Sequence, residues 1–159
     1  DLVFQMLVHD PVSYVNAPVL AEQRGVEVSL TTDPTIEDSR SVVRVELTLT
    51  SGTRVCVGGA VTGASNAERI VEVDGFEIDV PISEHLAFLL CDDKPGVVGI
   101  IGQMLGAANI NIASMQVSRD DTGRALIVLS VDTPIAPDLL DSISERTNAH
   151  YGRFTSLLL

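Results

Sequence analysis

The order of hydrophobic patterns over residues 84–159 restricts the fold of this chain more than any other feature. Residues 85–92, HLAFLLCD, form a short apolar run typical of a strand. Residues 96–107 carry apolar side chains at helical spacing, and Asn109 stands where this helix ends. The remaining predicted elements are strands at 110–119 and 125–132, a helix at 137–147 opened by Pro137, and a last strand at 152–159.

This order of strand, helix, strand, strand, helix, strand is that of the ferredoxin-like split βαβ arrangement. Residues 26–82 have a different pattern, with period-two alternation at 42–50 and a strong hairpin signal at Asp74-Gly75. Further predicted elements are helices at 2–8 and 13–24, the latter capped by Gly25, a strand at 26–32 and a loop at 33–38. The sequence therefore predicts an α+β fold: a small antiparallel sheet domain with helices at 1–83, then a βαββαβ domain at 84–159.

The charge balance excludes several classes of partner. The chain holds 22 acidic and 10 basic residues, a net charge of −12, which argues against binding to nucleic acid or to an anionic membrane. Trp is absent, and four Phe and two Tyr offer few platforms for stacking bases. No apolar run reaches the ~20 residues of a membrane-spanning helix, and no secretory signal pattern opens the chain.

The two cysteines, Cys56 and Cys91, lie inside apolar strand-like runs without partners at metal-site or disulfide spacing. We therefore expect free thiols in a cytoplasmic protein. The opening residues, DLVFQMLVHD, begin inside an amphipathic helix pattern with no cap and no initiator Met, so we expect a fragment of a longer chain.

Residues 91–105, CDDKPGVVGIIGQML, admit three interpretations. The adjacent carboxylates of Asp92 and Asp93 could act as an acid–base pair, but their side chains should diverge and no nucleophile or base motif accompanies them. The repeated glycines match neither a dinucleotide fingerprint nor a P-loop. A strand that turns through Pro95 and Gly96 into a helix presents free backbone N–H groups that suit a carboxylate, beside an Asp93 that suits an ammonium group. The stretch therefore matches a free amino acid.

The same residues resemble a known family. The segment LLCDDKPGVVGIIGQMLGAANINIASMQVSR, followed by ALIVLSVD, is similar to the ACT domain that ends long-form D-3-phosphoglycerate dehydrogenases. Upstream, YVNAPVLAEQRGVEV, RSVVRVELTL and ERIVEVDGFEIDV resemble the intervening domain that precedes ACT in the longer enzymes. The resemblance covers nearly the whole chain.

This resemblance implies a regulatory role. The parent enzyme would oxidise 3-phosphoglycerate with NAD in the first step of L-serine synthesis, through domains missing here, so this chain needs no cofactor, catalytic residue or metal. ACT domains pair edge to edge, and serine binds at their interface as a feedback inhibitor. By position, Asp93 would meet the ligand's ammonium group, and the N–H groups after Pro95, at Gly96 and Val97, its carboxylate. Asn111 would reach the ligand from the same or the facing subunit.

The chain departs from the family pattern in two respects. Cys91 stands where a hydrogen-bonding residue, often His or Tyr, precedes the key Asp, and a thiol is a weak donor. Arg69 could belong to an anion site that some relatives carry in the intervening domain, but Phe76 and Pro81 supply no further charge.

Other charged residues receive simpler interpretations. The three histidines lie in three different elements without ligand spacing, and we expect ordinary surface or partly buried imidazoles. Arg119 and Arg124 flank the turn at 120–123, where we expect them to be solvated or paired with Asp120 or Asp121.

The sequence leaves three functional hypotheses. The first is a regulatory fragment of phosphoglycerate dehydrogenase that binds L-serine and forms homo-oligomers through its ACT sheet. The second is an assembly module that has lost its ligand. The third is the regulatory part of another amino-acid enzyme, with a different amino acid as effector.

Overall fold

The computed structural model describes residues 15–31, 42–63 and 66–157. The chain divides into two units, Asp1–Ser39 and Arg40–Leu159, and each is described by itself. The helix predicted at 2–8 and the loop predicted at 33–38 lie outside the described residues. Among the described residues, no helix is long and apolar enough to cross a lipid bilayer.

The first unit contains helix α2, Ala17–Gln23, which has a proline in its first turn. Gly25 follows it with a φ of +69°, so the predicted glycine cap is confirmed. The strand predicted at 26–32 is wrong for residues 26–31, which form no strand. Alternation alone does not make a strand: Val28 and Leu30 are 67% and 94% exposed, so the apolar side chains have no buried face to occupy.

The second unit begins with an antiparallel sheet in the order β1-β2-β3-β4. Its strands are β1 (Val42–Thr48), β2 (Arg54–Thr62), β3 (Ala67–Val73) and β4 (Phe76–Pro81). Asp74 and Gly75 both have positive φ, 51° and 86°, as a two-residue turn between β3 and β4 requires, so the predicted hairpin is confirmed.

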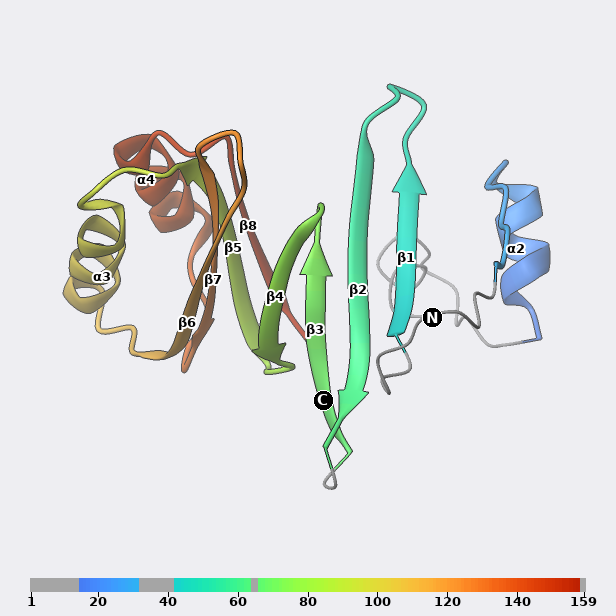
Figure 1. The fold of residues 1–159 in the computed structure, drawn as a ribbon, viewed down its shortest axis with the longest axis horizontal. Helices are drawn as coiled ribbons and strands as arrows, with labels where there is room; N and C mark the ends of the chain where they lie inside the picture. The colour runs from blue at the N-terminus through green and yellow to red at the C-terminus, as the bar shows by residue number, and fades with distance from the viewer. Residues whose placement is uncertain (1–14, 32–41, 64–65, 158–159) are drawn as a thin grey trace. The chain divides into compact units, whose positions relative to one another are not determined.

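The second sheet has the order β6-β7-β5-β8 and carries two helices (Figure 1). Its elements are β5 (His85–Asp92), α3 (Val97–Ala107), β6 (Ile112–Arg119), β7 (Arg124–Val131), α4 (Pro137–Thr147) and β8 (Tyr151–Ser156). Asn109, with a φ of 56°, follows α3 as expected. This is the predicted ferredoxin-like order, and with the first sheet it confirms an α+β fold.

Strand β5 explains how the two sheets share a core. Ala87, Leu89 and Cys91 belong to the apolar cluster that includes α3 and α4 residues. Leu86 and Leu90, on the alternate face, pack with residues of β3 and β4 such as Phe76 and Val80. Because both faces are covered, the central residues 86–91 of this strand, LAFLLC, are all apolar. The connection between the sheets spans residues 82–84, and the domain boundary placed there stays a prediction.

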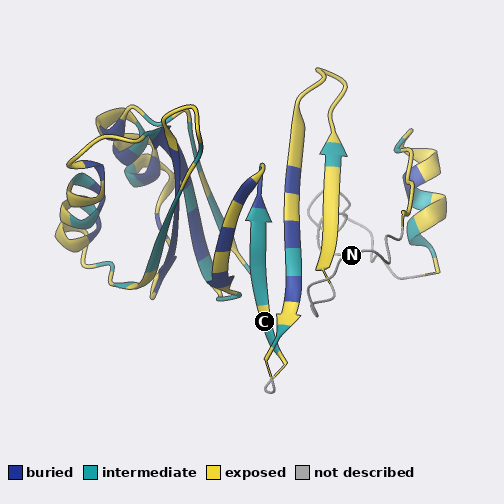
Figure 2. Cartoon of the chain, in the orientation of Figure 1, coloured by how far each residue is buried: buried dark blue, intermediate teal, exposed yellow. Residues whose placement is uncertain are grey.

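The apolar face of the first sheet is only partly covered. Strand β4 alternates between buried and exposed residues, a pattern typical of a sheet solvated on one side. Strand β1, at the sheet edge, is exposed along nearly its whole length (Figure 2), and Val43 and Val45 are 69% and 50% exposed. The β1–β2 end of this face therefore leaves apolar surface in contact with water.

Candidate functional site

A hollow of about 330 Å³ opens where β5 ends and α3 begins. We call it the β5–α3 pocket. The residues that line it are Cys91, Asp92, Asp93, Lys94, Pro95, Gly96, Val97, Val98, Val117, Arg119, Ala125 and Ile127. The structure thus brings together all of the predicted effector residues except Asn111.

The turn into α3 depends on Gly96. Its φ of +96° is a left-handed conformation that glycine adopts without strain. Gly96 offers no side chain to cap the helix, and the first turn of α3 holds no acidic residue. The first N–H groups of a helix have no partner within it. Those at this turn are therefore suitable donors for a carboxylate.

Asp93, the residue predicted to bind an ammonium group, is already paired within the chain. Arg119 Nε donates to Asp93 Oδ2 at 2.7 Å, and both side chains are partly exposed. The turn at 120–123 brings Arg119 there, because the Asp93 N–H donates to the Gly123 carbonyl at 2.9 Å. Arg119 is a site residue that sequence reasoning missed. The antiparallel pairing of β5 with β7 places this turn beside the end of β5. The predicted ferredoxin-like strand order implies this pairing, so it could have placed Arg119 near Asp93.

The other charges at this turn form separate pairs. Arg124 pairs with Asp120 at 2.7 Å, one of the alternatives expected from the sequence. Asp92 accepts from Lys94 Nζ at 2.8 Å and contacts His150 Nε2 at 3.1 Å. The hydrogen bond from Lys94, followed by that from His150, lowers the pKa of Asp92 below its ordinary value. Adjacent carboxylates that serve different cations do not share a proton, and this geometry gives no support to an acid–base pair.

Cys91 forms an inner wall of the pocket and is only 1% exposed. Its Sγ lies 3.7 Å from the Ala125 carbonyl oxygen, a weak hydrogen bond. Burial raises the pKa of the Cys91 thiol, and the negative charges of Asp92 and Asp93 raise it further. The side chain is therefore a neutral thiol that contributes mainly apolar surface to the pocket.

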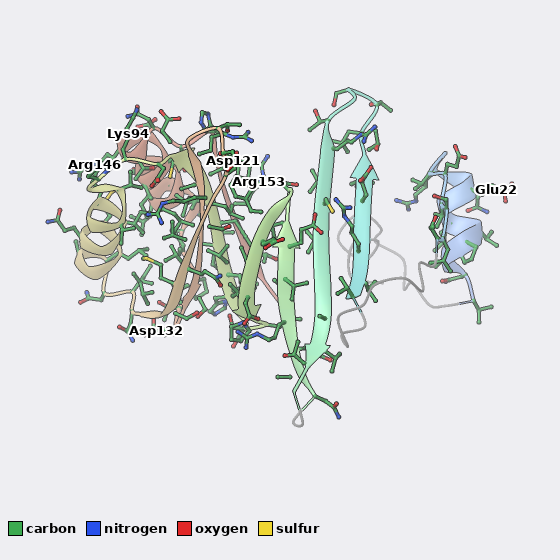
Figure 3. The ribbon with its side chains drawn as sticks, in the orientation of Figure 1. Glu22, Lys94, Asp121, Asp132, Arg146 and Arg153 are labelled. Carbon is green, nitrogen blue, oxygen red and sulfur yellow. The ribbon has the colours of Figure 1, made fainter. Side chains whose placement is uncertain are left out.

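Asn111 does not line the pocket of its own chain. Its backbone N–H donates to Asp132 Oδ1 at 2.9 Å. Figure 3 shows Lys94, at the pocket, and Asp132 at opposite ends of the second sheet. Within one chain, Asn111 is thus remote from Asp93, and its contact with a ligand stays a prediction.

Arg69, the candidate for an anion site, lies on β3 and does not line the β5–α3 pocket. Its Nε is hydrogen-bonded to Asp79 Oδ1, and its Nη2 donates to the Asp79 carbonyl oxygen at 2.8 Å. The charge of Arg69 is thus already compensated by a neighbouring strand. An anion site at this position stays a prediction.

Comparison with known proteins gives two family matches. The family described as "ACT domain" matches residues 85–147, and the family described as "D-3-phosphoglycerate dehydrogenase intervening domain" matches residues 2–74. Together they cover most of the chain.

Three curated relatives share the name D-3-phosphoglycerate dehydrogenase. The Synechocystis protein is 40% identical over 84% of this chain and 24% of its own length. The Mycobacterium leprae protein is 34% identical over 93% of this chain and 28% of its own length, and the Bacillus subtilis protein is 32% identical over 86% and 26%. The chain therefore spans about a quarter of the length of these relatives.

Proposed function

Because the chain belongs to the C-terminal regulatory part of the D-3-phosphoglycerate dehydrogenase family, we propose that it binds L-serine as a feedback effector in the β5–α3 pocket. The NAD-dependent oxidation of 3-phosphoglycerate would belong to domains outside these 159 residues. The proposal includes a cytoplasmic location, because Cys56 and Cys91 are both free thiols and reducing compartments keep thiols in this state.

One observation carries the proposal: a carboxylate and the first turn of a helix border the same small hollow. The Asp93 carboxylate suits an ammonium group, and the N–H groups of Gly96 and Val97 suit a carboxylate. A free amino acid carries both charges a short distance apart. The volume of about 330 Å³ is at the small end of the range for ligand pockets, which favours a small amino acid.

The proposal further includes pairing of two copies through strand β6. This strand lies at the edge of the second sheet, so one row of its backbone groups has no neighbouring strand among the described residues. In an antiparallel pair related by a twofold axis, the start of one strand lies beside the end of the other. Asn111 precedes β6 and Arg119 ends it, so the partner's β6 would bring its preceding residue to the pocket. A ligand there would be held by both copies.

The regulatory effect would be a coupling free energy. A ligand that bridges two copies stabilises the arrangement in which both sides of the site are complete. That arrangement would then bias the distant catalytic domains, with a coupling of about 1–3 kcal/mol if this system is typical.

Calorimetric titration with L-serine tests the proposal directly. We expect Asp93→Ala to weaken binding about tenfold or more, because it removes a charge-assisted hydrogen bond. Asp121→Ala is the matched control, since it removes the same charge from the turn at 120–123 but does not line the pocket. Equal affinity of the two variants for serine would contradict the assignment of Asp93.

The Asp93–Arg119 pair favours a second candidate, an assembly module without a ligand. In such a module, the internal ion pair would permanently occupy the ammonium position. The absence of binding heat, together with an unchanged melting temperature in millimolar serine, would support this candidate. Titration of glycine, valine and aromatic amino acids would then separate it from a regulator with a different effector.

A further inference from the structure

A second hollow, of about 360 Å³, lies between the two sheets of the Arg40–Leu159 unit. We call it the inter-sheet hollow. The first sheet supplies Val55, Val57 and Val73, and the second supplies Phe88, Tyr151 and Arg153. The inter-sheet hollow shares no lining residue with the β5–α3 pocket. The proposed function therefore leaves it without a role.

The floor of the inter-sheet hollow is apolar. Val57 and Val73 are cross-strand partners on β2 and β3. Val55 and Val57 are each 40% exposed, whereas Val73 is 6% exposed at the covered end of the same face. Phe88 is half-buried on the opposite wall. A ligand with an apolar body would remove this valine surface from water, which is favourable by roughly 25 cal/mol per Å².

One cation faces this apolar floor. Arg153 is the cross-strand partner of Phe88, so both side chains lie on the same face of the second sheet. Its guanidinium carbon lies 5.9 Å from the centre of the Tyr151 ring. Figure 3 labels Arg153 on the side of the second sheet that faces β4. Within the described part of the chain, Arg153 has no carboxylate at ion-pair distance, although acidic residues outnumber basic ones by 22 to 10.

The other ionisable groups of the hollow already have partners. Asp74 accepts the Cys56 N–H through Oδ1 at 2.9 Å and the Tyr151 hydroxyl through Oδ2 at 3.1 Å. Burial, and then the charge of Asp74, raises the pKa of Tyr151 well above its ordinary value, so the phenol stays neutral. Arg54 also borders the hollow, but its guanidinium lies 3.7 Å from Glu46, on the neighbouring strand. Arg153 is thus the cation lining the hollow that has no carboxylate at ion-pair distance among the described residues.

We propose that the inter-sheet hollow binds a small monocarboxylic acid with a branched or aromatic body, whose carboxylate pairs with Arg153 and whose body packs on Val55, Val57 and Phe88. Thr53, which also lines the hollow, accepts a hydrogen bond from Ser51 and retains its own hydroxyl proton for a second bond to the carboxylate. A phosphorylated sugar acid fits less well, because its hydroxyl groups would lie against valines without hydrogen-bond partners. Because both sheets contribute, a bound acid would stabilise their packing against each other.

Titration of the full 159-residue chain with 4-methylpentanoate, followed by calorimetry and by amide NMR shifts, tests this proposal. We expect binding below about 10 mM, a higher melting temperature, and shifts at Val55, Val57 and Phe88 but not at Gly96. The neutral analogue 4-methylpentanamide and the short acid acetate should bind about tenfold more weakly or not at all, since each lacks one of the two recognised features.

Two variants locate the charge and the apolar contact. Arg153→Gln should weaken binding of 4-methylpentanoate about tenfold, whereas Arg146→Gln, which removes the same charge from the exposed end of α4, should not. Val57→Thr keeps the shape of the side chain and should weaken 4-methylpentanoate binding by a smaller factor. The proposal is overturned by equal binding of the acid and the amide, by equal effects of the two arginine variants, by competition from inorganic phosphate, or by no binding up to about 10 mM.

Discussion

Asp93 and Arg119 compete with any ligand for the same contact. An ammonium group can bind the Asp93 carboxylate fully only if Arg119 Nε, at 2.7 Å, moves away. Both side chains are partly exposed, so water can solvate the freed guanidinium. An exposed ion pair of this kind contributes about 0.2–1 kcal/mol. The competition therefore reduces ligand affinity but does not prevent binding.

Replacing Arg119 tests this competition. We expect Arg119→Gln to increase the affinity for L-serine by up to about fivefold, which corresponds to the free energy of an exposed pair. Arg124→Gln is a matched control, because its guanidinium pairs with Asp120 and not with Asp93. Weaker serine binding by Arg119→Gln would show instead that the guanidinium contacts the ligand's carboxylate. Calorimetry on the three proteins separates these outcomes.

At the scale of helices, strands and turns, the backbone preferences of single residues were sufficient to predict most of the elements. Pro137 opens α4, and Asp74-Gly75 forms the hairpin turn, because each residue type restricts the backbone at its own position. The strand predicted at 26–32 is wrong for residues 26–31, because a strand depends on partners that alternation does not specify. The Arg119–Asp93 pair joins residues 26 positions apart, so it follows from the predicted strand order and not from any local pattern.

The packing of α4 against β8 requires a glycine at position 152. A Cβ atom there would lie 2.3 Å from Ser144 Oγ, whose hydroxyl donates to the Leu140 carbonyl at 2.8 Å. We expect Gly152→Ala to lower the free energy of unfolding by about 1–3 kcal/mol, as measured by urea denaturation. Ser144→Ala should rescue part of this loss, because it removes the clashing oxygen.

Gly99, inside α3, provides the opposite case. Apart from its chain neighbours and the backbone of its own helix, no atom of the described residues lies within 4 Å of the position of its missing Cβ. Gly99→Ala should therefore raise the free energy of unfolding by about 0.5–1 kcal/mol through helix propensity. Equal stability of the Gly152→Ala and Gly99→Ala proteins would contradict this account of the two positions.

The β6–β7 turn should make folding sensitive to acid. Burial raises the pKa of Asp120, but hydrogen bonds from the Arg124 and Thr122 backbone and side chains outweigh it, so the pKa lies well below its ordinary value. A lowered pKa in the folded state contributes stability above the unfolded value of about 3.9, and this contribution is lost as the pH falls below it. We expect Asp120→Asn to be less stable than wild type at pH near 7 and to lose less stability on acidification. Urea denaturation at several pH values measures both effects, with Asp121→Asn as the control within the same turn.

For the molecule as a whole, the proposed dimer predicts that two defective chains can restore one site. Among the described residues, Asn111 is held through its backbone: its N–H donates to Asp132 Oδ1 at 2.9 Å, and its carbonyl accepts from the Asp132 N–H at 3.1 Å. Asn111→Ala keeps both bonds, so it should fold normally but bind serine weakly. A mixture of Asn111→Ala and Asp93→Ala chains forms mixed dimers, each with one intact site if Asn111 reaches across to the partner's pocket. Calorimetry should then detect high-affinity sites that neither variant has alone.

The same mixture can also contradict the proposed dimer. If Asn111 acts within its own chain, or if the copies pair elsewhere than at β6, no mixed dimer contains an intact site and the high-affinity heat stays absent. Sedimentation of each variant alone checks that both still form dimers.

The uncovered valines of β1 and β2 have a consequence for handling the protein. An apolar face beside an unpaired edge strand is a template for intermolecular association. At neutral pH, a net charge of −12 per chain opposes association beyond the proposed dimer by mutual repulsion. We expect acidification to neutralise carboxylates and remove this repulsion while the two sheets are still folded. Colloidal stability, rather than unfolding, should therefore set the lowest pH at which concentrated solutions stay clear.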